Sequence, residues 1–321
     1  MQAIQSYESP AKLILLGEHF VIFGAPALAV PLLDLTTRVT LRQVNAPGAH
    51  LGELSWAPAT DPHPRHLEAK QRRQARGLLE HAITRVAPNS TSGFLLEAHS
   101  SIPLGYGLGS SAAFAVGVTV TLHALLNLHP DASTLSHHAH ALEKMVHGNP
   151  SGIDEAVVLK GLPLSLRKGE ATKLLKLSSP LSLVLASAGS PGSTREAVAR
   201  VAALREHAPE RFASLVAKAD ALGEAGIAAC ATGNLCALGA LLDRAHALLQ
   251  KVGVCPPRLD DLVQKARQAG ALGAKITGAG LGGFMVALVP PERVERVRAA
   301  LVASEGELVF STVVPATTGK T

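Results

Sequence analysis

The spacing of hydrophobic residues along this chain changes between a strand-like and a helical period, and these periods predict its elements. Strand-like patterns bounded by proline and glycine occur in the first half at residues 3–8, 12–16, 36–44 and 93–99. Helical periods occur there at residues 68–86, 109–126 and 132–147, and a short helix starts near Ser151. A surface loop is expected over residues 45–64 and a strand pair over residues 162–177.

The second half begins with an apolar strand, Leu181 to Ser187, directly after Ser179-Pro180. The chain is then nearly all helical from residue 193 to 269, with breaks near Pro209, Gly233 and Pro256. It ends with strands at 274–277, 283–288 and 307–313 and a helix at 291–303. These patterns predict an α+β protein of two domains, 1–178 and 179–321, the second made of helices and a small sheet.

The composition fits a globular protein that binds an anion. Of the 321 residues, 47% are hydrophobic and 3% are aromatic, so we expect a core of Leu, Val and Ala. The formal net charge of +5 favours an anionic ligand. The lysines and arginines are dispersed and not interleaved with aromatic residues, which argues against a nucleic-acid partner.

The cysteines and the apolar segments indicate the compartment. Cys230, Cys236 and Cys255 are odd in number and have no C-x-x-C spacing, which predicts free thiols and argues against a zinc site or disulfides. No set of acids or thiols that could ligate a metal is recognisable in the sequence. The apolar segment 13–35 is interrupted by charged residues and prolines, so no membrane span is predicted. We therefore expect a soluble, cytoplasmic protein.

Residues 103–112, called the first glycine loop below, read P-L-G-Y-G-L-G-S-S-A. Glycine lets a backbone turn tightly and approach a ligand, and a helix start presents N–H groups and a positive dipole end. Such a loop can hold a phosphate, and the hydroxyls of Ser110 and Ser111 suit a phosphate oxygen or Mg²⁺. The residues alone fit a serine-capped helix start without a ligand equally well, and they match neither a P-loop nor a dinucleotide fingerprint.

Residues 275–283, called the second glycine loop, read K-I-T-G-A-G-L-G-G and formally contain G-x-G-x-x-G. The residues that follow, Phe284 to Leu288, are strand-like, whereas a dinucleotide fingerprint opens a helix. A tight turn between two strands is therefore the favoured interpretation. The alternative is a turn whose backbone approaches a phosphate or a substrate.

Several charged residues next to apolar segments are further candidates. Glu143 lies at the edge of a helical stripe and Asp154 in the first turn of the next helix, where solvation and capping are sufficient explanations. Lys12, Glu18 and His19 flank an apolar strand and must find partners or face a cleft. Structural and functional interpretations are balanced for these three residues.

Taken together, these segments resemble the GHMP small-molecule kinases, which include galacto-, homoserine, mevalonate and phosphomevalonate kinases. The first glycine loop is similar to the family motif P-x-x-x-G-L-G-S-S-A, and the second to K-x-T-G-A-G-x-G-G. Residues 16–29 and the run from Glu143 to Asp154, with its H-G-N-P-S-G-I-D, resemble the mevalonate kinases within that family. The four motifs follow the family order over residues 12–283.

The resemblance implies an N-terminal domain like ribosomal protein S5 domain 2 and a ferredoxin-like C-terminal domain. It implies ATP and Mg²⁺ as ligands, mevalonate as the small-molecule substrate whose primary hydroxyl is phosphorylated, and a homodimer. The nucleotide would be bound by Pro103, Gly105, Gly107, Leu108, Gly109, Ser110, Ser111, Ala112, Gly278, Ala279 and Gly280.

The resemblance also assigns the remaining roles. Ser111 and Glu143 would hold Mg²⁺, and Asp154 would be the catalytic base with Lys12 beside it. The substrate would be contacted by Lys12, Glu18, His19, Asp154 and Thr194. The chain departs from the family at Ser193, where asparagine is frequent, and at Glu155, where a neutral residue is common. The alternatives are a phosphomevalonate kinase, a mevalonate 3-kinase or a nucleotide-binding regulator without catalysis.

Overall fold

A computed structural model describes residues 3–57, 65–148 and 150–317 of the chain. The chain divides into two compact units. Unit 1 comprises Met1–Ala11, Leu33–Leu104 and Gly109–Gly161, and unit 2 comprises Lys12–Leu32, Gly105–Leu108 and Leu162–Thr321. The units are thus interleaved along the chain, whereas the sequence suggests a single division at residue 178, which stays a prediction.

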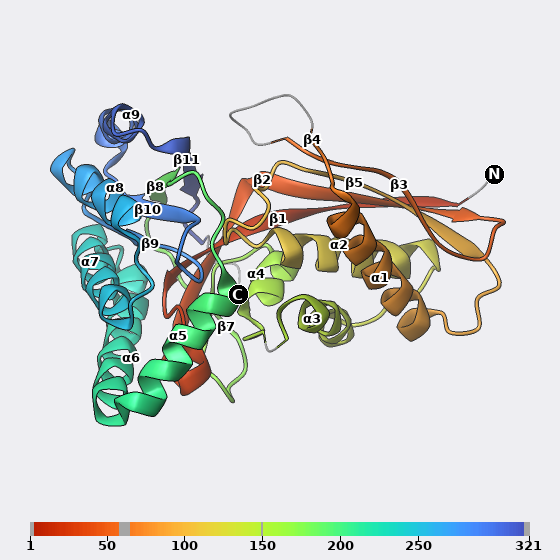
Figure 1. The fold of residues 1–321 in the computed structure, drawn as a ribbon, viewed down its shortest axis with the longest axis horizontal. Coiled ribbons are helices and arrows are strands. Elements are labelled where there is room, and N and C mark those ends of the chain that lie inside the picture. The colour runs from red at the N-terminus through yellow and green to blue at the C-terminus, as the bar shows by residue number, and fades with distance from the viewer. Residues whose placement is uncertain (1–2, 58–64, 149, 318–321) are drawn as a thin grey trace. The chain divides into compact units, whose positions relative to one another are not determined.

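Unit 1 is built on a sheet in which β5 (Gly93–Ser100) lies between β2 (Ala27–Val44) and β3 (Gly48–Trp56), as Figure 1 shows. Strand β5 is antiparallel to β2 and parallel to β3. The long β1 (Ile4–Leu16) pairs with β2, and the short β4 (Arg65–His66) pairs with β3. Val39 and Leu41 of β2 are buried while Arg38 and Arg42 are exposed, so the alternation gives the sheet one apolar face.

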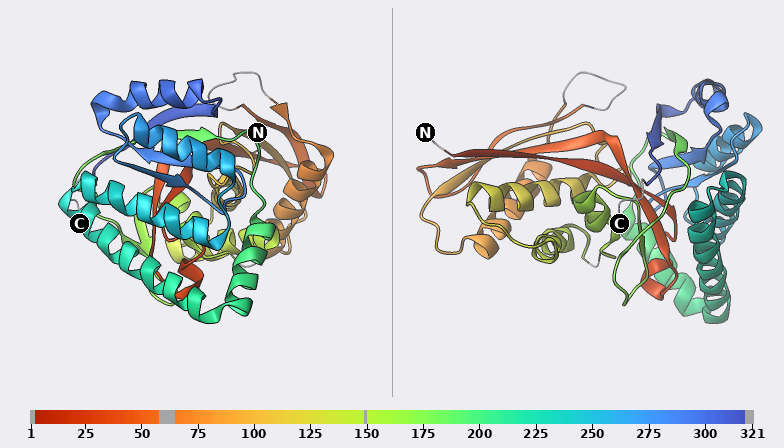
Figure 2. Two further views of the ribbon diagram at one scale, coloured as in Figure 1. Left: turned by 60° about the vertical axis from the view of Figure 1, so that its left-hand side comes forward. Right: turned by 180° about the vertical axis from the view of Figure 1, so that it is seen from behind.

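Helices of unit 1 cover that apolar face (Figures 1 and 2). They are α1 (Ala69–Val86), α2 (Ser110–Leu125), α3 (Ala132–His147) and the short α4 (Ile153–Lys160). The core between the sheet and α1, α2 and α3 consists mainly of Leu, Val and Ala, as the composition predicts. Helix α3 begins at Asp131, whose carboxylate accepts a hydrogen bond from the Thr134 N–H at 2.7 Å.

Two predictions about strands in this part of the chain are wrong. Residues 3–8 and 12–16 form one continuous strand, β1, because Ser9 and Pro10 stay extended within it. Residues 48–56 of the expected loop form β3, where Leu54 is fully buried and the strand pairs with β5. Pairing with a distant strand overrides the turn-prone composition of this segment. Residues 58–64 of the expected loop lie outside the described part of the chain.

Unit 2 contains an antiparallel sheet with the order β11-β8-β10-β9. Its strands are β8 (Leu181–Ser187), β9 (Gly273–Ile276), β10 (Phe284–Leu288) and β11 (Glu307–Val314). Nearly every residue of β8, β9 and β10 is buried, and α8 (Pro257–Gln268) and α9 (Val294–Ala303) pack against these strands. In the same unit, β6 (Leu164–Leu166) pairs with the start of β2 and with β7 (Lys173–Leu174).

The helical stretch of unit 2 is confirmed with its breaks. It consists of α5 (Thr194–His207), α6 (Pro209–Thr232), α7 (Leu235–Val252) and α8, followed by the short η2 (Pro291–Arg293) before α9. Gly233 ends α6 with a φ of 69°, and the Asn234 side chain starts α7 by accepting from the Ala237 N–H at 3.0 Å. Helix α6 packs closely on Leu16, because a Cβ on Gly226 would lie 2.4 Å from its Cδ1.

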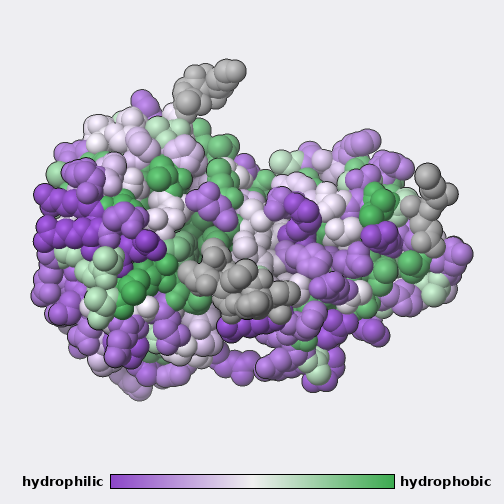
Figure 3. Space-filling view, turned by 90° about the horizontal axis from the view of Figure 1, so that it is seen from above, coloured by the Kyte–Doolittle hydropathy of each residue, from purple (hydrophilic) through white to green (hydrophobic). Residues whose placement is uncertain are grey.

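Hydrophilic residues cover most of the face that Figure 3 shows, with hydrophobic residues in small scattered patches. Isolated exposed hydrophobic residues such as Leu33 and Val302 are ordinary for a protein surface. In the described part of the chain, every helix is too short or too polar to cross a membrane.

Candidate active site

The first glycine loop has the backbone that its glycines predict. Gly105, Gly107 and Gly109 have φ angles of 83°, 84° and 80°, in the left-handed region that favours glycine. Gly109 is the N-cap of α2, so the unpaired N–H groups of the first helical turn follow the loop directly. Within unit 2, the Leu108 carbonyl accepts the backbone N–H of Lys12 at 3.0 Å, which ties the loop to β1.

Ser111 and Glu143 come together in unit 1. The Ser111 hydroxyl donates to Oε2 of Glu143 at 3.3 Å and lies 2.9 Å from Nε2 of His147. Glu143 is only 1% exposed although it is a helical glutamate, so simple solvation does not explain its position. A hydroxyl and a buried carboxylate are oxygen ligands of the kind that Mg²⁺ prefers, so these residues fit the expected ion. His147 was missed in the sequence, although it lies one helical turn after Glu143.

The second glycine loop connects β9 to the antiparallel β10, which confirms the predicted turn between strands. Gly278, Gly280 and Gly283 have φ angles of 77°, 81° and 80°. A Cβ on Gly283 would lie 2.7 Å from the Tyr106 carbonyl oxygen, and one on Gly278 would lie 3.2 Å from the Gly107 Cα. Within unit 2, residues 105–108 of the first glycine loop therefore lie against the second loop at a distance that leaves no space for side chains.

His19 is held by the second glycine loop. It has a φ of 61°, rare for a residue with a side chain, and its Nε2 lies 2.8 Å from the Ala279 carbonyl oxygen. Burial lowers the pKa of His19, although the Ala279 hydrogen bond and the Glu18 charge oppose this shift. The ring is thus neutral at pH 7, and because a carbonyl only accepts, Nε2 carries the proton. This tautomer presents Nδ1 as a hydrogen-bond acceptor.

Glu18 has a partner that the sequence analysis missed. Its carboxylate forms a buried ion pair with Lys275 at the end of β9, and Lys275 also donates to the Ile276 carbonyl at 2.6 Å. Both side chains are almost fully buried, at 4% and 0% exposure. One sequence signal could have singled out Lys275: it is the only charged residue in the apolar segment 271–276. Nothing in a sequence could show that its partner lies 257 residues away.

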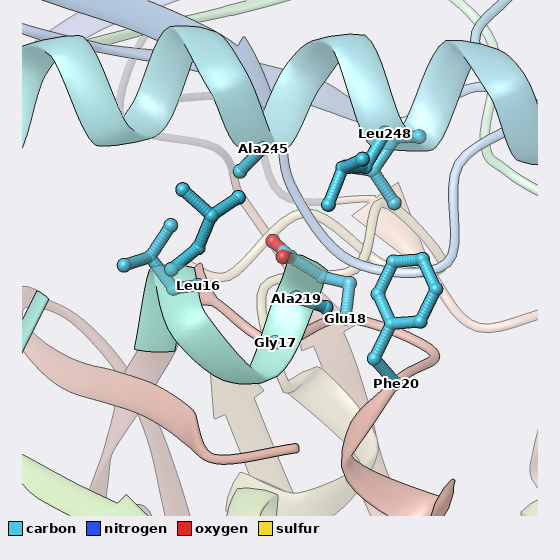
Figure 4. A pocket seen from close by; sticks show the side chains of 9 residues that line it. Leu16, Gly17, Glu18, Phe20, Ala219, Ala245 and Leu248 are labelled. Carbon is cyan, nitrogen blue, oxygen red and sulfur yellow. The ribbon is translucent and has the colours of Figure 1, made fainter. Parts of the chain in front are cut away.

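Glu18 also lines a small cavity in unit 2, seen in Figure 4. The other lining residues are Leu16, Gly17, Phe20, Ala219, Leu222, Ala245, Leu248 and Leu249. They come from the end of β1, from the segment after it, and from α6 and α7. In Figure 4 the Glu18 carboxylate points toward α7, between Ala245 and Leu248. The cavity is therefore apolar except for one carboxylate that the Lys275 ammonium neutralises.

The remaining predicted site residues are divided between the two units. Asp154 lies in the first turn of α4 after the N-cap Gly152, half-buried, in unit 1. Lys12 lies on β1 in unit 2 and is 3% exposed. Thr194 is the exposed first residue of α5, which is capped by the Ser193 side chain. The pairing of Lys12 with Asp154 and the substrate contact of Thr194 stay predictions.

Glu155, where the chain departs from the family pattern, does not add a solvated charge next to Asp154. Its side chain is 1% exposed and is hydrogen-bonded to the His140 ring of α3. Burial raises the pKa of Glu155, with the Asp154 charge adding to the effect and His140 opposing it. Glu155 therefore connects α4 to α3 inside unit 1.

Comparisons with known proteins match the two segments of the chain that contain the glycine loops. Residues 75–161 match the model of the GHMP kinases N terminal domain, and residues 227–308 match that of the GHMP kinases C terminal. The chain is 33% identical to the mevalonate kinase of Thermococcus onnurineus and 34% identical to that of Pyrococcus furiosus. Both alignments cover 92% of this chain and 92% of the relative.

Solved structures show the same fold. The structure of L. major mevalonate kinase in complex with R-mevalonate has a TM-score of 0.87 at 24% identity, over 99% of this chain and 98% of that chain. The Methanococcus jannaschii mevalonate kinase has a TM-score of 0.77 at 21% identity, over 98% of each chain. The Lactococcus lactis galactokinase complexed with galactose has a TM-score of 0.71 at 22% identity, over 99% and 94%.

Proposed function

Because the chain belongs to the mevalonate kinase family of the GHMP kinases, we propose that it transfers the γ-phosphoryl group of ATP to the primary hydroxyl of mevalonate. The products are 5-phosphomevalonate and ADP. The observation that carries the proposal is the contact between Ser111 and Glu143. Ser111 lies at the start of a helix, directly after a loop whose glycines have left-handed φ angles. A hydroxyl, a buried carboxylate and unpaired N–H groups form a binding site for a metal-bound polyphosphate.

The two glycine loops bind the nucleotide phosphates in this proposal. Residues 107–111 offer backbone N–H groups and the dipole of α2, which has no acidic residue in its first turn. In unit 2, Gly278 and Gly280 of the second loop lie where a Cβ would be 3.2 Å from the Gly107 Cα and 2.4 Å from the Val254 carbonyl oxygen, so their backbone is open to a phosphate. Ser111 and Glu143 would hold Mg²⁺, which would offset the negative charge of the phosphate oxygens.

Asp154 and Lys12 act on the substrate hydroxyl. Phosphoryl transfer depends mainly on positioning and on neutralisation of charge, so a carboxylate that accepts the hydroxyl hydrogen bond aligns the nucleophile. The Lys12 ammonium stabilises the charge that develops on the alcohol oxygen. Because the transition state is loose, Asp154 orients the hydroxyl before it accepts the proton.

His19 is the better supported of the other substrate contacts. Its Nδ1 can accept a hydrogen bond from a substrate hydroxyl, since Nε2–H is engaged with Ala279. Glu18 contributes indirectly, because its carboxylate is paired with Lys275. Thr194 offers an exposed hydroxyl at the start of α5. The homodimer and the cytoplasmic location are carried by the resemblance and by the composition alone.

A substrate panel tests the activity. The protein is incubated with ATP, Mg²⁺ and either mevalonate, phosphomevalonate, galactose or homoserine, and ADP release is followed. We expect release with mevalonate alone, and phosphorus NMR of the product to place the phosphate on the primary hydroxyl. Phosphate on the tertiary hydroxyl would identify a mevalonate 3-kinase. Absence of ADP release with every substrate would favour a nucleotide-binding regulator.

The variant Asp154→Asn tests the assigned base. We expect turnover to be abolished while ATP binding is retained, because the amide cannot accept the proton but preserves the shape of the side chain. The matched control is Asp131→Asn, at the start of α3, where either side chain caps the helix. Turnover of Asp154→Asn at the wild-type rate would refute the assignment.

A further inference from the structure

Three side chains that the proposed reaction does not use converge inside unit 2. They are His246 on α7, Cys255 in the segment between α7 and α8, and Asp260 on α8. One ligand atom from each lies within 4.8 Å of the other two. Sγ of Cys255 is 4.0 Å from Nδ1 of His246, and Oδ1 of Asp260 is 3.0 Å from Nε2 of the same ring. The imidazole thus lies between a thiol and a carboxylate.

The cluster is partly sheltered from water. His246 is 3% exposed, whereas Cys255 and Asp260 are partly exposed, and Oδ1 of Asp260 lies against Nε2 of His246. These three side chains therefore offer a thiol sulfur, a ring nitrogen and a carboxylate oxygen to one cation.

The kinds of donor atom select the kind of cation. A thiolate, an imidazole and a carboxylate are the ligands that zinc uses in proteins, and a thiolate disfavours the harder Mg²⁺. One ring nitrogen, Sγ and one carboxylate oxygen all lie within 4.8 Å of one another, so small movements of these side chains would bring three donors to a tetrahedral zinc. The spacing of the ligands in the sequence, at positions 246, 255 and 260, resembles no zinc motif, so sequence analysis argued against such a site.

The same environment argues against a nucleophilic thiol. Burial raises the pKa of Cys255 to about 12, with the Asp260 charge adding to the effect. A thiol of this kind is inert at pH 7, because only the thiolate attacks. When a divalent cation binds, Sγ gives up its proton to solvent and the new bond joins sulfur to metal. One proton is therefore released from the thiol for each ion bound.

The cluster is directly connected to the second glycine loop. The carbonyl oxygen of Val254, next to Cys255 in the chain, accepts the Leu281 N–H at 2.8 Å. The same oxygen would lie 2.4 Å from a Cβ on Gly280, so segment and loop are in close contact. An ion that fixes Cys255 also fixes the support of the loop.

We propose that His246, Cys255 and Asp260 form a binding site for a soft divalent cation of the zinc class, and that an ion there restrains the second glycine loop. The site is separate from the Mg²⁺ ligands Ser111 and Glu143, which lie in unit 1. The proposal does not depend on the identity of the phosphorylated substrate.

Cobalt substitution tests the site without an activity assay. The full chain is titrated with Co²⁺, and the near-ultraviolet charge-transfer band of a cobalt thiolate is recorded. We expect one equivalent to saturate the band, zinc to displace it, and one proton to be released from the thiol. Cys255→Ser should lose the band, whereas Cys236→Ser, which changes the exposed thiol at the start of α7, should keep it. No saturable band in the folded wild type, or a band that persists in Cys255→Ser, would overturn the proposal.

Hydrogen exchange tests the connection to the loop. With saturating Zn²⁺, the amides of residues 277–283 should exchange more slowly in the wild type, and Cys255→Ser should show no such change. A conservative His246→Gln variant that remains folded should bind cobalt at least about 10-fold more weakly, because one of three ligands is lost. Zinc binding without slower exchange in residues 277–283 would overturn the restraint of the loop.

Discussion

The buried carboxylate of Glu155 on α4 is hydrogen-bonded to the partly exposed imidazole of His140 on α3, in unit 1. The pair connects the helix that carries Asp154 to the helix that carries Glu143. The proposed base and the proposed metal ligand thus lie on two helices that this polar contact joins. Such a contact is costly to bury, and it fixes one arrangement of the helices only while both partners are present.

The raised pKa of Glu155 predicts a pH dependence of stability. Below pH 4.5, the ordinary pKa of glutamate in the unfolded chain, Glu155 is protonated in both states and makes its full contribution to the free energy of unfolding. This contribution is lost as the pH rises through the raised pKa of Glu155 in the folded protein. The free energy of unfolding of the wild type, relative to Glu155→Gln, should therefore decrease above pH 4.5. Urea unfolding from about pH 4 to 8 measures this difference. The exposed Glu210→Gln serves as control, and a difference independent of pH would contradict the prediction.

The buried pair of Lys275 and Glu18 predicts a non-additive double-mutant cycle. Lys275→Met should lower the free energy of unfolding by about 3–5 kcal/mol, since it leaves Glu18 as an uncompensated buried charge. Adding Glu18→Gln should restore part of that loss. Lys173→Met, which breaks an exposed pair with Glu170, should cost less than about 1 kcal/mol. Equal losses from both lysine variants would show that the buried pair is unimportant.

The close approach of the glycine loops predicts a strong effect of Gly283→Ala. A methyl group there meets the Tyr106 carbonyl oxygen at 2.7 Å, in addition to the strain of a φ of 80°. Gly161→Ala has a similar φ of 61° but open space, so it measures the strain alone, about 1–2 kcal/mol. We expect Gly283→Ala to cost about 1–3 kcal/mol more in urea unfolding and to weaken ATP binding. If both variants lost the same free energy of unfolding, the two glycine loops would be able to move apart without destabilising the protein.

The Ser111–Glu143 pair predicts a changed requirement for magnesium. Ser111→Ala and Glu143→Gln should raise the Mg²⁺ concentration for half-maximal activity by at least about 10-fold, since each removes an oxygen ligand. Ser133→Ala, on the exposed first turn of α3, should leave it unchanged. If the Mg²⁺ requirement of both site variants matched that of the wild type, the ion would have to bind elsewhere.

Sequence reasoning was most successful where a signal is local. The breaks between α5, α6, α7 and α8 follow from proline and glycine, and the left-handed glycines follow from the residue type. It failed where a distant partner decides. Strand β3 exists because β5 is available beside it, although its own composition resembles a loop.

The site shows the same division. The glycine loops, Ser111 and Glu143 were recognisable from motifs, because each motif is continuous in the chain. Lys275 as the partner of Glu18 and the cluster around His246 were not, since tertiary structure alone brings them together. The burial of Glu155 was equally invisible, because a glutamate beside Asp154 reads as a solvated charge until its His140 partner is known.

The interleaving of the two units limits how this protein can be recombined. The chain passes from one unit to the other after Ala11, Leu32, Leu104, Leu108 and Gly161. A chimera that joins the front of one related kinase to the back of another at any single point would mix two parents inside at least one unit. At residue 108 the junction would even divide the first glycine loop. Functional hybrids of such enzymes should therefore require several matched crossovers. Recombination at a single point should yield fewer active proteins than exchange of the whole gene.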